Sequence, residues 1–396
     1  MRVLVVGSGG REHALAWAIA RSPSLTELHA APGNPGMAAI AHCHPVRADD
    51  PASLLPLARE LRIDLVVVGP EAPLVLGLGD LLRQRGIAVF GPNAAAARIE
   101  GSKAFAKEVM DAAGVPTART LPVARPPCVV KADGLAAGKG VWVCRTQAEL
   151  DTGLRAAEAL GQPFHVEELL EGPELSVFAI AAGEDAVVLP PARDYKRVGD
   201  GDAGPNTGGM GSFSPLPDVP DAESVEILDL IHRPVLRELA RRRTPFHGLL
   251  YAGLMRTEDG LRVIEFNARF GDPETQSLLP RLDGDLLPVL AGDLAQPPQV
   301  APRAAVTVVL AGGEYPERGD SGTPIEGVDV AEATGALVFH AGTALRDGRL
   351  VTNGGRVLNV VGVGLTVPEA RTAAYDAVSH IDFAGMRHRT DIAANA

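Results

Sequence analysis

The sequence predicts a mixed α/β and α+β chain of several domains that begins with a parallel sheet. The chain has 396 residues, 46% of them hydrophobic, which is more than one ordinary core accommodates. Its first hundred residues alternate short apolar runs with apolar residues at helical spacing, the pattern of an open parallel sheet. Glycine (44 residues) and proline (32) are scattered between apolar runs, so they indicate turns and not disorder.

The first element follows from the segment MRVLVVGSGGREHALAWAIARS. An apolar run, a glycine turn and apolar residues at helical spacing predict a strand, a loop and a helix. Apolar runs at residues 28–31, 65–68 and 87–90 predict the next strands. Because open α/β sheets bind ligands beyond the carboxyl ends of their strands, the loops after these strands are candidate binding loops.

The glycine loop after the first strand suggests a phosphate site more than a dinucleotide site. The fingerprint G-x-G-x-x-G would need glycine where this chain has Glu12, and no acidic residue ends the second strand. The backbone N–H groups from Gly7 to Arg11 are expected to form a nest for one phosphate, with Arg11 as a charge partner. A tight turn without a ligand is the alternative. Glu71 follows another strand at the same expected edge of the sheet.

Charge and cysteine usage exclude several classes of function. The formal net charge of −12 argues against a broad interface with nucleic acid or an anionic membrane. Cys43, Cys128 and Cys144 are few, far apart and without metal-site spacing, which indicates a reducing compartment. No leader is recognised and no uncharged apolar stretch reaches the roughly 18 residues that a membrane helix needs. We therefore expect a cytoplasmic protein.

The segment VVKADGLAAGKGV combines a buried strand that carries Lys131 with a glycine-rich connection. It does not match the P-loop pattern, because Gly134 and Gly138 have three residues between them and Gly140 follows Lys139 where a hydroxyl should bind the metal. A glycine-rich hairpin with lysines can still cover a triphosphate and close after the nucleotide enters. An ordinary surface hairpin is the alternative.

A second candidate site lies on the segment LRVIEFNARFGDPETQ. In a strand Glu265 and Asn267 project from one face while Phe266 points to the other, and Arg269 continues the first face. Two hard oxygen ligands at this spacing suit Mg²⁺ bridging phosphates. A half-buried strand with a polar outer face is the alternative. Upstream, Glu167, Glu168 and Glu174 surround a Gly-Pro turn.

Other charged or histidine-rich stretches have simpler interpretations. The histidines of HCH, at positions 42 and 44, have no further ligands at recognisable spacing and are expected at a strand end. The arginines 241–243 are expected near a helix end, where the helix dipole favours cations. From about Ala301 the chain returns to strand-like runs, with one helix around residues 369–381. We expect this part to complete the substrate cleft.

Taken together, the ordered motifs resemble those of the phosphoribosylamine-glycine ligase family, which are ATP-grasp enzymes of purine synthesis. The resemblance spans essentially the whole chain and includes APGNPG, GSKAFAK, ARDYKRVGDGDAGPNTGGMGSFSP, EFNARFGDPE and VTNGGRVLNVVG. It implies a Rossmann-like N-terminal sheet, an ATP-grasp core of two subdomains and a small C-terminal α/β domain. The implied boundaries are 1–100, 101–295 with a flap subdomain at about 118–180, and 300–396.

The resemblance also implies roles for individual residues. The ATP phosphates would be held by Lys103 and Lys131 and by a flap that includes Gly138, Lys139 and Gly140. Adenine would meet the linker at Glu167, Glu168 and Leu170, and the ribose would meet Glu174. Glu265 and Asn267 would bind Mg²⁺ or Mn²⁺. The implied phosphoribosylamine site comprises Gly9, Gly10, Arg11, Glu71, Asn206, Thr207, Gly208 and Gly209. Asp194, Lys196 and Arg269 would lie beside the reacting groups and act in catalysis.

The implied reaction joins glycine to 5-phosphoribosylamine with ATP, through glycyl phosphate, in the second step of purine biosynthesis. The implied partners are these small molecules, without nucleic acid or membrane, and a monomer is expected. A related ATP-grasp ligase or carboxylase with another acceptor remains the alternative enzyme. A nucleotide-binding regulator without turnover and an NAD-dependent dehydrogenase are rivals from other classes.

Overall fold

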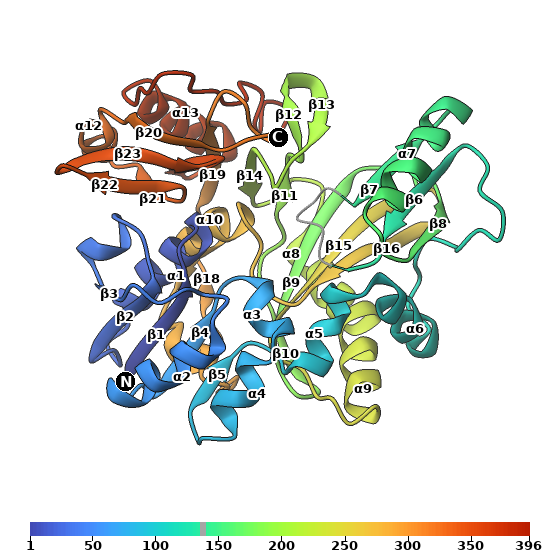
Figure 1. Ribbon diagram of the computed structural model, residues 1–396, viewed down its shortest axis with the longest axis horizontal. Coiled ribbons are helices and arrows are strands. Elements are labelled where there is room, and N and C mark those ends of the chain that lie inside the picture. The colour runs from blue at the N-terminus through green and yellow to red at the C-terminus, as the bar shows by residue number, and fades with distance from the viewer. Residues whose placement is uncertain (135–139) are drawn as a thin grey trace.

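The computed structural model describes residues 1–134 and 140–396. Figure 1 shows three parts: the N-terminal domain in blue, the C-terminal domain in red above it, and a green and yellow lobe beside both. Within the described residues, no helix has the length and apolar character needed to cross a membrane. The domain boundaries drawn from the sequence stay predictions.

The N-terminal domain is a five-stranded parallel sheet with the order β3-β2-β1-β4-β5. Its central strands are apolar and fully buried, as expected for a parallel sheet with both faces covered. This confirms the predicted open sheet. Its strands are β1 (Arg2–Gly7), β2 (Glu27–Pro32), β3 (His42–Cys43), β4 (Leu65–Val68) and β5 (Ala88–Phe90). Its helices are α1 (Gly10–Ala20), α2 (Pro51–Glu60), α3 (Glu71–Val75), α4 (Leu78–Arg83), α5 (Ala94–Gly101) and the short 3₁₀ turn η1 (Met37–Ala39).

The lobe beside this domain contains two antiparallel sheets. The smaller has the order β7-β6-β8, with β6 (Cys128–Ala132), β7 (Val141–Cys144) and β8 (Phe164–Glu168), and α7 (Gln147–Ala159) packs on it around a small core of its own. The larger has the order β10-β9-β15-β16, with β9 (Glu174–Ala182), β10 (Asp185–Val188), β15 (His247–Thr257) and β16 (Gly260–Asn267). Its helices are α6 (Lys103–Ala113), α8 (Asp221–Ile227), η3 (Leu228–His232) and α9 (Arg233–Arg241).

The C-terminal domain shares a sheet with strands from the middle of the chain. The order is β11-β14-β19-β24-β21, so β14 (Gly211–Ser214) pairs with β19 (Ala304–Ala311) while β11 (Arg193–Asp194) forms the edge. The C-terminal segment therefore packs against the middle of the chain, and its completing of the substrate cleft stays a prediction. The remaining strands of this domain are β20 (Asp320–Pro324), β21 (Leu337–His340), β22 (Thr343–Arg346), β23 (Arg349–Gly354) and β24 (Arg356–Gly364), with helices α12 (Val328–Ala333) and α13 (Val367–Val378).

Short elements link these units. The hairpin of β12 (Arg197–Gly199) and β13 (Ala203–Asn206) follows β11, with the turn η2 (Asp200–Asp202) at its tip. The connection toward the C-terminal domain contains α10 (Glu274–Leu278), η4 (Leu279–Arg281), β17 (Leu282–Asp283), α11 (Leu287–Leu290) and β18 (Gln299–Val300).

Candidate active site

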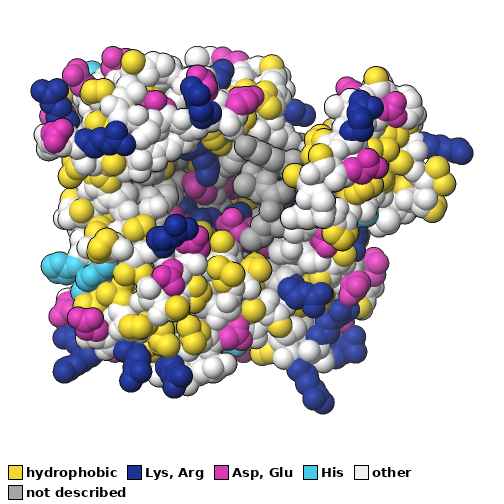
Figure 2. All heavy atoms as spheres, in the orientation of Figure 1, with side chains coloured by type: hydrophobic (Ala, Val, Ile, Leu, Met, Phe, Trp, Pro, Cys, Tyr) yellow, Lys and Arg dark blue, Asp and Glu magenta, His cyan; other side chains and the backbone are white. Residues whose placement is uncertain are grey.

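The space-filling view is hollowed where the three parts meet, and Lys, Arg, Asp and Glu side chains gather on the floor of the hollow (Figure 2). Strand β16, the N-terminal nest and the loop after β13 all supply residues that the sequence predicts for one site. Their ion pairs and hydrogen bonds bring these segments together.

The end of β16 carries the predicted polar face. Arg269 follows the strand, and its guanidinium donates to Asn267 Oδ1 at 3.2 Å. Phe266, between Glu265 and Asn267, is buried on the opposite face, as the strand period requires. The predicted alternation of Glu265, Phe266 and Asn267 is therefore present.

Arg269 also joins β16 to the N-terminal domain. Its guanidinium lies 3.0 Å from Glu100 Oε1 and 3.4 Å from Glu71 Oε2. Burial disfavours its charge, but these two carboxylates outweigh burial and raise its pKa. Burial likewise opposes the charge of Glu71, while Arg269 and Arg11 overcome it and lower the pKa. Arg269 is thus a fixed cation between the domains.

Glu100 was missed by sequence reasoning. It lies near the end of α5, accepts the N–H of Ala268 at 2.7 Å, and burial raises its pKa despite the charge of Arg269. Its segment, ARIEG, has the appearance of an ordinary helix end, and no spacing in the sequence signals a partner 168 residues away.

Lys131 is held on β6 by a buried carboxylate. Its Nζ lies 2.6 Å from Glu167 Oε2 and donates to the carbonyl of Ile264 on β16 at 3.0 Å. Lys107 contacts the other oxygen of Glu167 at 2.9 Å. Burial raises the pKa of Glu167, but the hydrogen bond from His165 and the two lysine charges lower it to about 2. The side chain of Glu167 therefore orients Lys131, a role that the sequence did not reveal.

Lys103 begins α6 beside the same strand. Its backbone N–H donates to Asp133 Oδ1 at 2.6 Å, and its Nζ donates to the carbonyl of Gly134 at 3.3 Å. Burial lowers the pKa of this lysine; the nearby Glu265 charge works against that effect and the Lys131 charge adds to it. Two cationic side chains thus lie near the β16 carboxylate, an arrangement that can hold phosphate oxygens.

The predicted adenine linker spans the last two residues of β8 and the residues after it. The carboxylate of Glu168 accepts two hydrogen bonds from the side chain of Arg119, at 2.8 and 2.6 Å. The backbone N–H of Glu168 donates to the carbonyl of Arg119 at 3.0 Å. The Leu170 backbone lies outside strands, between β8 and β9. The predicted flap residues Gly138 and Lys139 lie outside the described residues, while the carbonyl of Gly140 accepts the N–H of Ala132 at 2.8 Å.

Carboxylates cluster around Lys196, whose Nζ lies 2.6 Å from Glu174 Oε2. Burial raises the pKa of Asp194 to about 7; Lys196 opposes this, and the charges of Glu274, Glu174 and Glu265 add to it. The described cluster is therefore rich in negative charge. Carboxylate and amide oxygens, such as those of Glu265 and Asn267, are the donors that a divalent cation prefers, so these two residues fit the predicted metal.

The glycine nest differs from its prediction. Gly9 N–H donates to Glu12 Oε2 at 2.6 Å, and Arg11 Nε donates to Glu12 Oε1 at 2.6 Å. A second guanidinium nitrogen of Arg11 donates to the carbonyl of Phe270 at 3.1 Å. Gly10 packs so closely that a β-carbon there would lie 2.0 Å from Asn359 Nδ2. In this structure the Glu12 carboxylate accepts from the Gly9 N–H and from the Arg11 side chain, so a phosphate at Gly9 would have to displace it.

The loop after β13 contacts the strand from the C-terminal domain. Thr207 donates to the carbonyl of Lys196 through its N–H at 2.7 Å and its hydroxyl at 2.9 Å. Arg356, which sequence reasoning missed, donates to the carbonyl of Gly208 at 2.5 Å and to Asp272 Oδ2 at 2.8 Å. Gly209 has a φ of +108°, and a β-carbon there would lie 2.4 Å from Pro273. Asn206 pairs with Arg197 across the hairpin.

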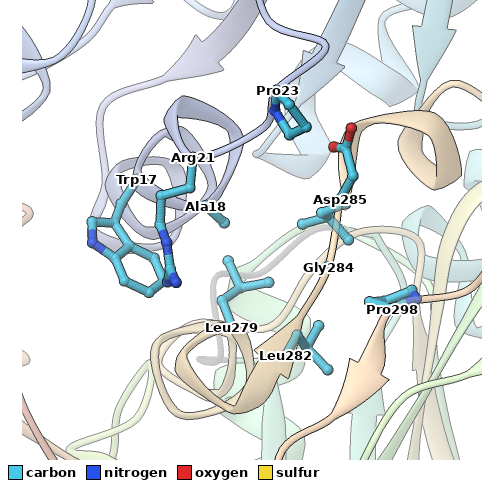
Figure 3. Close-up of a pocket in the computed structure, with 10 residues that line it drawn as sticks. Trp17, Ala18, Arg21, Pro23, Leu279, Leu282, Gly284, Asp285 and Pro298 are labelled. Atoms are coloured by element: carbon cyan, nitrogen blue, oxygen red, sulfur yellow. The ribbon is translucent and has the colours of Figure 1, made fainter.

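A separate cavity of about 350 Å³ lies between α1 and the segment 279–286 (Figure 3). Trp17 and Arg21 point the same way on one side, with the guanidinium carbon 4.6 Å from the indole centroid, and Leu279 and Leu282 form the floor. None of its lining residues belongs to the predicted site.

No cluster of three or more metal-binding side chains of the His, Cys, Asp or Glu type occurs within residues 1–134 and 140–396. His42 lies on the two-residue edge strand β3, and His44 follows the end of that strand.

The sheet β7-β6-β8 carries Lys131, and the sheet β10-β9-β15-β16 carries Glu265. This pair of antiparallel sheets defines the class of the protein as ATP-grasp. Profiles of one family match the chain in three consecutive blocks: the phosphoribosylglycinamide synthetase N domain at residues 1–100, its ATP-grasp (A) domain at 101–275 and its C domain at 305–395. The chain belongs to the phosphoribosylglycinamide synthetase family, and its fold binds ATP.

Individual relatives match this chain over nearly their full length. The phosphoribosylamine-glycine ligase of Streptomyces coelicolor is 50% identical, over 100% of this chain and 99% of that protein. The one from Corynebacterium ammoniagenes is 49% identical, over 99% and 97%. The crystal structure of the Thermotoga maritima phosphoribosylamine-glycine ligase is 35% identical, covers 99% of this chain and 100% of that chain, and has a TM-score of 0.84.

A more distant likeness shows the fold alone. The biotin carboxylase domain of Hydrogenobacter thermophilus 2-oxoglutarate carboxylase, solved with MgADP and bicarbonate, is 17% identical. It has a TM-score of 0.72 and covers 98% of this chain and 91% of that chain.

Proposed function

We propose that this protein joins glycine to 5-phosphoribosylamine at the expense of ATP, giving glycinamide ribonucleotide, ADP and phosphate in the second step of purine biosynthesis. The full-length likeness to phosphoribosylamine-glycine ligases supports the two substrates. The observation that supports the chemistry most directly is the placement of Lys131. It is fixed by Glu167 at 2.6 Å and by the Ile264 carbonyl of β16 at 3.0 Å, next to the strand that carries Glu265.

The first step is attack of the glycine carboxylate on the γ-phosphorus of ATP. The bond from the γ-phosphorus to the bridging oxygen breaks, and ADP leaves. Lys103 and Lys131 neutralise charge on the phosphates, and Arg269 provides a fixed cation for the carboxylate or the transferred phosphoryl group. Mg²⁺, held by Glu265 and Asn267, would supply charge neutralisation between the phosphates when bound.

The second step forms the amide. The amine nitrogen of phosphoribosylamine attacks the acyl carbon of glycyl phosphate, the bond from that carbon to the phosphate oxygen breaks, and the nitrogen loses a proton. No side-chain nucleophile is needed, because the phosphate is already a good leaving group. The contribution of the protein is to hold both substrates in contact and to exclude water from glycyl phosphate.

The phosphoribosylamine would lie between the N-terminal domain and the loop at residues 206–209. Glu71 supports this placement, since Arg269 joins it to the end of β16 at 3.4 Å. Arg356 supports it as well, because it connects the loop to Asp272 at 2.8 Å.

The function is tested by measuring ADP release from purified protein with ATP, Mg²⁺ and freshly generated phosphoribosylamine, with and without glycine. Glycine-dependent ADP release with an equal amount of glycinamide ribonucleotide is expected. ADP release that depends on bicarbonate and not on glycine would assign a carboxylase instead. ATP binding without ADP formation in either mixture would favour a regulator without turnover.

The proposal includes a monomer that works in the cytoplasm. A single species of about the chain mass, 41.2 kDa, is expected in light scattering of the purified protein. A mass of twice that value would overturn the monomer.

A further inference from the structure

The largest fully buried side chain of the described protein is an arginine seven residues from the C-terminus, Arg389. Its Nε and one terminal nitrogen bind both oxygens of Asp391, at 2.7 and 2.6 Å. Its other terminal nitrogen donates to Asp202 Oδ1 at 2.7 Å and to the carbonyl of Arg197 at 3.2 Å. The guanidinium lies 4.8 Å from the centroid of the Tyr195 ring. The two acceptors other than Asp391, Asp202 and the Arg197 carbonyl, belong to the hairpin β12–β13.

The neighbours of Arg389 bind the same hairpin. Thr390 donates to Asp200 through its N–H at 2.8 Å and through its hydroxyl at 2.5 Å. In the other direction, the N–H of Gly201 donates to Asp391 Oδ2 at 2.9 Å. Figure 1 shows the C-terminus beside β12 and β13. We name residues 389–391 the C-terminal clasp.

The hairpin depends on this clasp. In the part of the chain that the structure describes, the hydrogen bonds and ion pairs between residues 197–206 and residues outside them all end on the clasp. Residues 200–205 are exposed. Because an isolated two-stranded hairpin is at best marginally stable in water, contacts with the clasp are what give this one a fixed orientation.

The hairpin lies between two predicted parts of the active site. Lys196, which pairs with Glu174, directly precedes β12, and the loop at residues 206–209 begins at the last residue of β13. Thr207 ties the two ends together through its two hydrogen bonds to the Lys196 carbonyl. A change in hairpin orientation is therefore passed to both ends.

We propose that the C-terminal clasp positions the 206–209 loop and Lys196 for phosphoribosylamine, with Arg389 as its central positioning residue. This proposal rests on the proposed function. The clasp acts on the site through the hairpin and its two ends, and it reaches the ATP side only through the ion pair of Lys196 with Glu174, so its loss affects the use of phosphoribosylamine more than the affinity for ATP.

The principal test removes the hairpin side of the contact. Asp202 has a φ of +55°, a conformation that asparagine tolerates well, so Asp202→Asn removes the charge without new backbone strain. In the double variant Asp200→Asn/Asp202→Asn, the KM for phosphoribosylamine is expected to rise about tenfold, the size of losing one charge-assisted hydrogen bond. The KM for ATP is expected to stay within about twofold.

Two readouts separate positioning from general damage. Hydrogen exchange at residues 197–209 is expected to accelerate in the double variant, with unchanged exchange in β1 and β15. Asp49→Asn is the matched control, because Asp49 forms an exposed ion pair with Arg47 at 2.7 Å, away from the hairpin, and is expected to change neither constant. Arg389→Met is the stronger variant, and Arg389→Lys is expected to restore part of the phosphoribosylamine KM.

The outcomes distinguish this proposal from the proposed function. If the wild-type protein does not ligate glycine, the proposed function fails, and the exchange measurement alone still tests the clasp. An unchanged KM together with unchanged exchange in the double variant would overturn the clasp. An equal rise in both KM values would overturn its selective role in positioning.

Discussion

The carboxylate of Glu12 lies against the backbone of Gly9, with 2.6 Å between Oε2 and the amide nitrogen. It also fills space over Gly7 and Gly69, where β-carbons would lie 2.5 and 2.1 Å from atoms of the Glu12 side chain. The glycines of this loop therefore accommodate a glutamate.

The first prediction follows from this contact. A β-carbon at Gly9 would lie 2.7 Å from Glu12 Oε2, so Gly9→Val must displace the carboxylate. We expect the KM for phosphoribosylamine to rise by about tenfold, with ATP affinity unchanged, because Gly9 lies in the N-terminal domain away from the lysines. Steady-state kinetics and ATP titration check this. Equal losses for both ligands would mean that the loop is structural only.

The second prediction concerns the metal. In Glu265→Ala we expect turnover to fall by about 100-fold or more, since the carboxylate proposed to bind Mg²⁺ is removed. Raising Mg²⁺ should recover part of the rate. Glu258→Ala changes an exposed glutamate at the turn before β16 and serves as the control. A near-normal rate of Glu265→Ala at ordinary Mg²⁺ would contradict the assignment.

The third prediction separates structure from binding at Glu167. Glu167→Gln leaves Lys131 and Lys107 buried without their shared anion, which is expected to cost about 3 kcal/mol of unfolding free energy. The KM for ATP should rise as Lys131 loses its orientation. Glu168→Gln is the stability control, because its partner Arg119 is exposed and ion pairs in water contribute little to stability. Urea unfolding measures the free energy of unfolding of both variants. Equal values for Glu167→Gln and Glu168→Gln would refute the structural role of the buried Glu167 carboxylate.

The fourth prediction is a pH dependence at the contact between α1 and the C-terminal domain. His340 donates its N–H to His13 Nδ1 at 2.8 Å. Burial lowers the pKa of His340 to about 4, and burial with the nearby His340 lowers that of His13 to about 3. Below pH 6.5 the unfolded chain binds protons that the folded chain does not, so this pair makes stability fall as the pH falls from 6.5 toward 4.

The size of this effect can be measured by difference. At about pH 5 one such histidine destabilises the fold by about 2 kcal/mol relative to about pH 8. His340→Asn should therefore lessen the loss of unfolding free energy between about pH 8 and about pH 5 by that amount. Urea unfolding at several pH values gives both curves, and parallel curves for the variant and the wild type would refute the interpretation.

Local pattern predicted much of the fold and part of the site. The strand period placed Glu265, Asn267 and Arg269 together, and apolar runs located the strands of the N-terminal sheet. Contacts between distant segments left no such signal: Arg356 meets Asp272 across 84 positions, and Lys131 meets the Ile264 carbonyl across 133. The sequence did not reveal that Glu12 contacts the nest, because the reach of its side chain depends on where β4 brings Gly69.

The sheet that joins the middle of the chain to its end has a consequence for synthesis. Asp194 lies on the edge strand β11, and β14 can complete its ladder only when β19 is present. All five strands of the N-terminal sheet, in contrast, lie within the first 90 residues. On the ribosome the protein would gain a folded first domain early, whereas the sheet that carries Asp194, a proposed catalytic residue, would be completed only after roughly the last hundred residues have emerged.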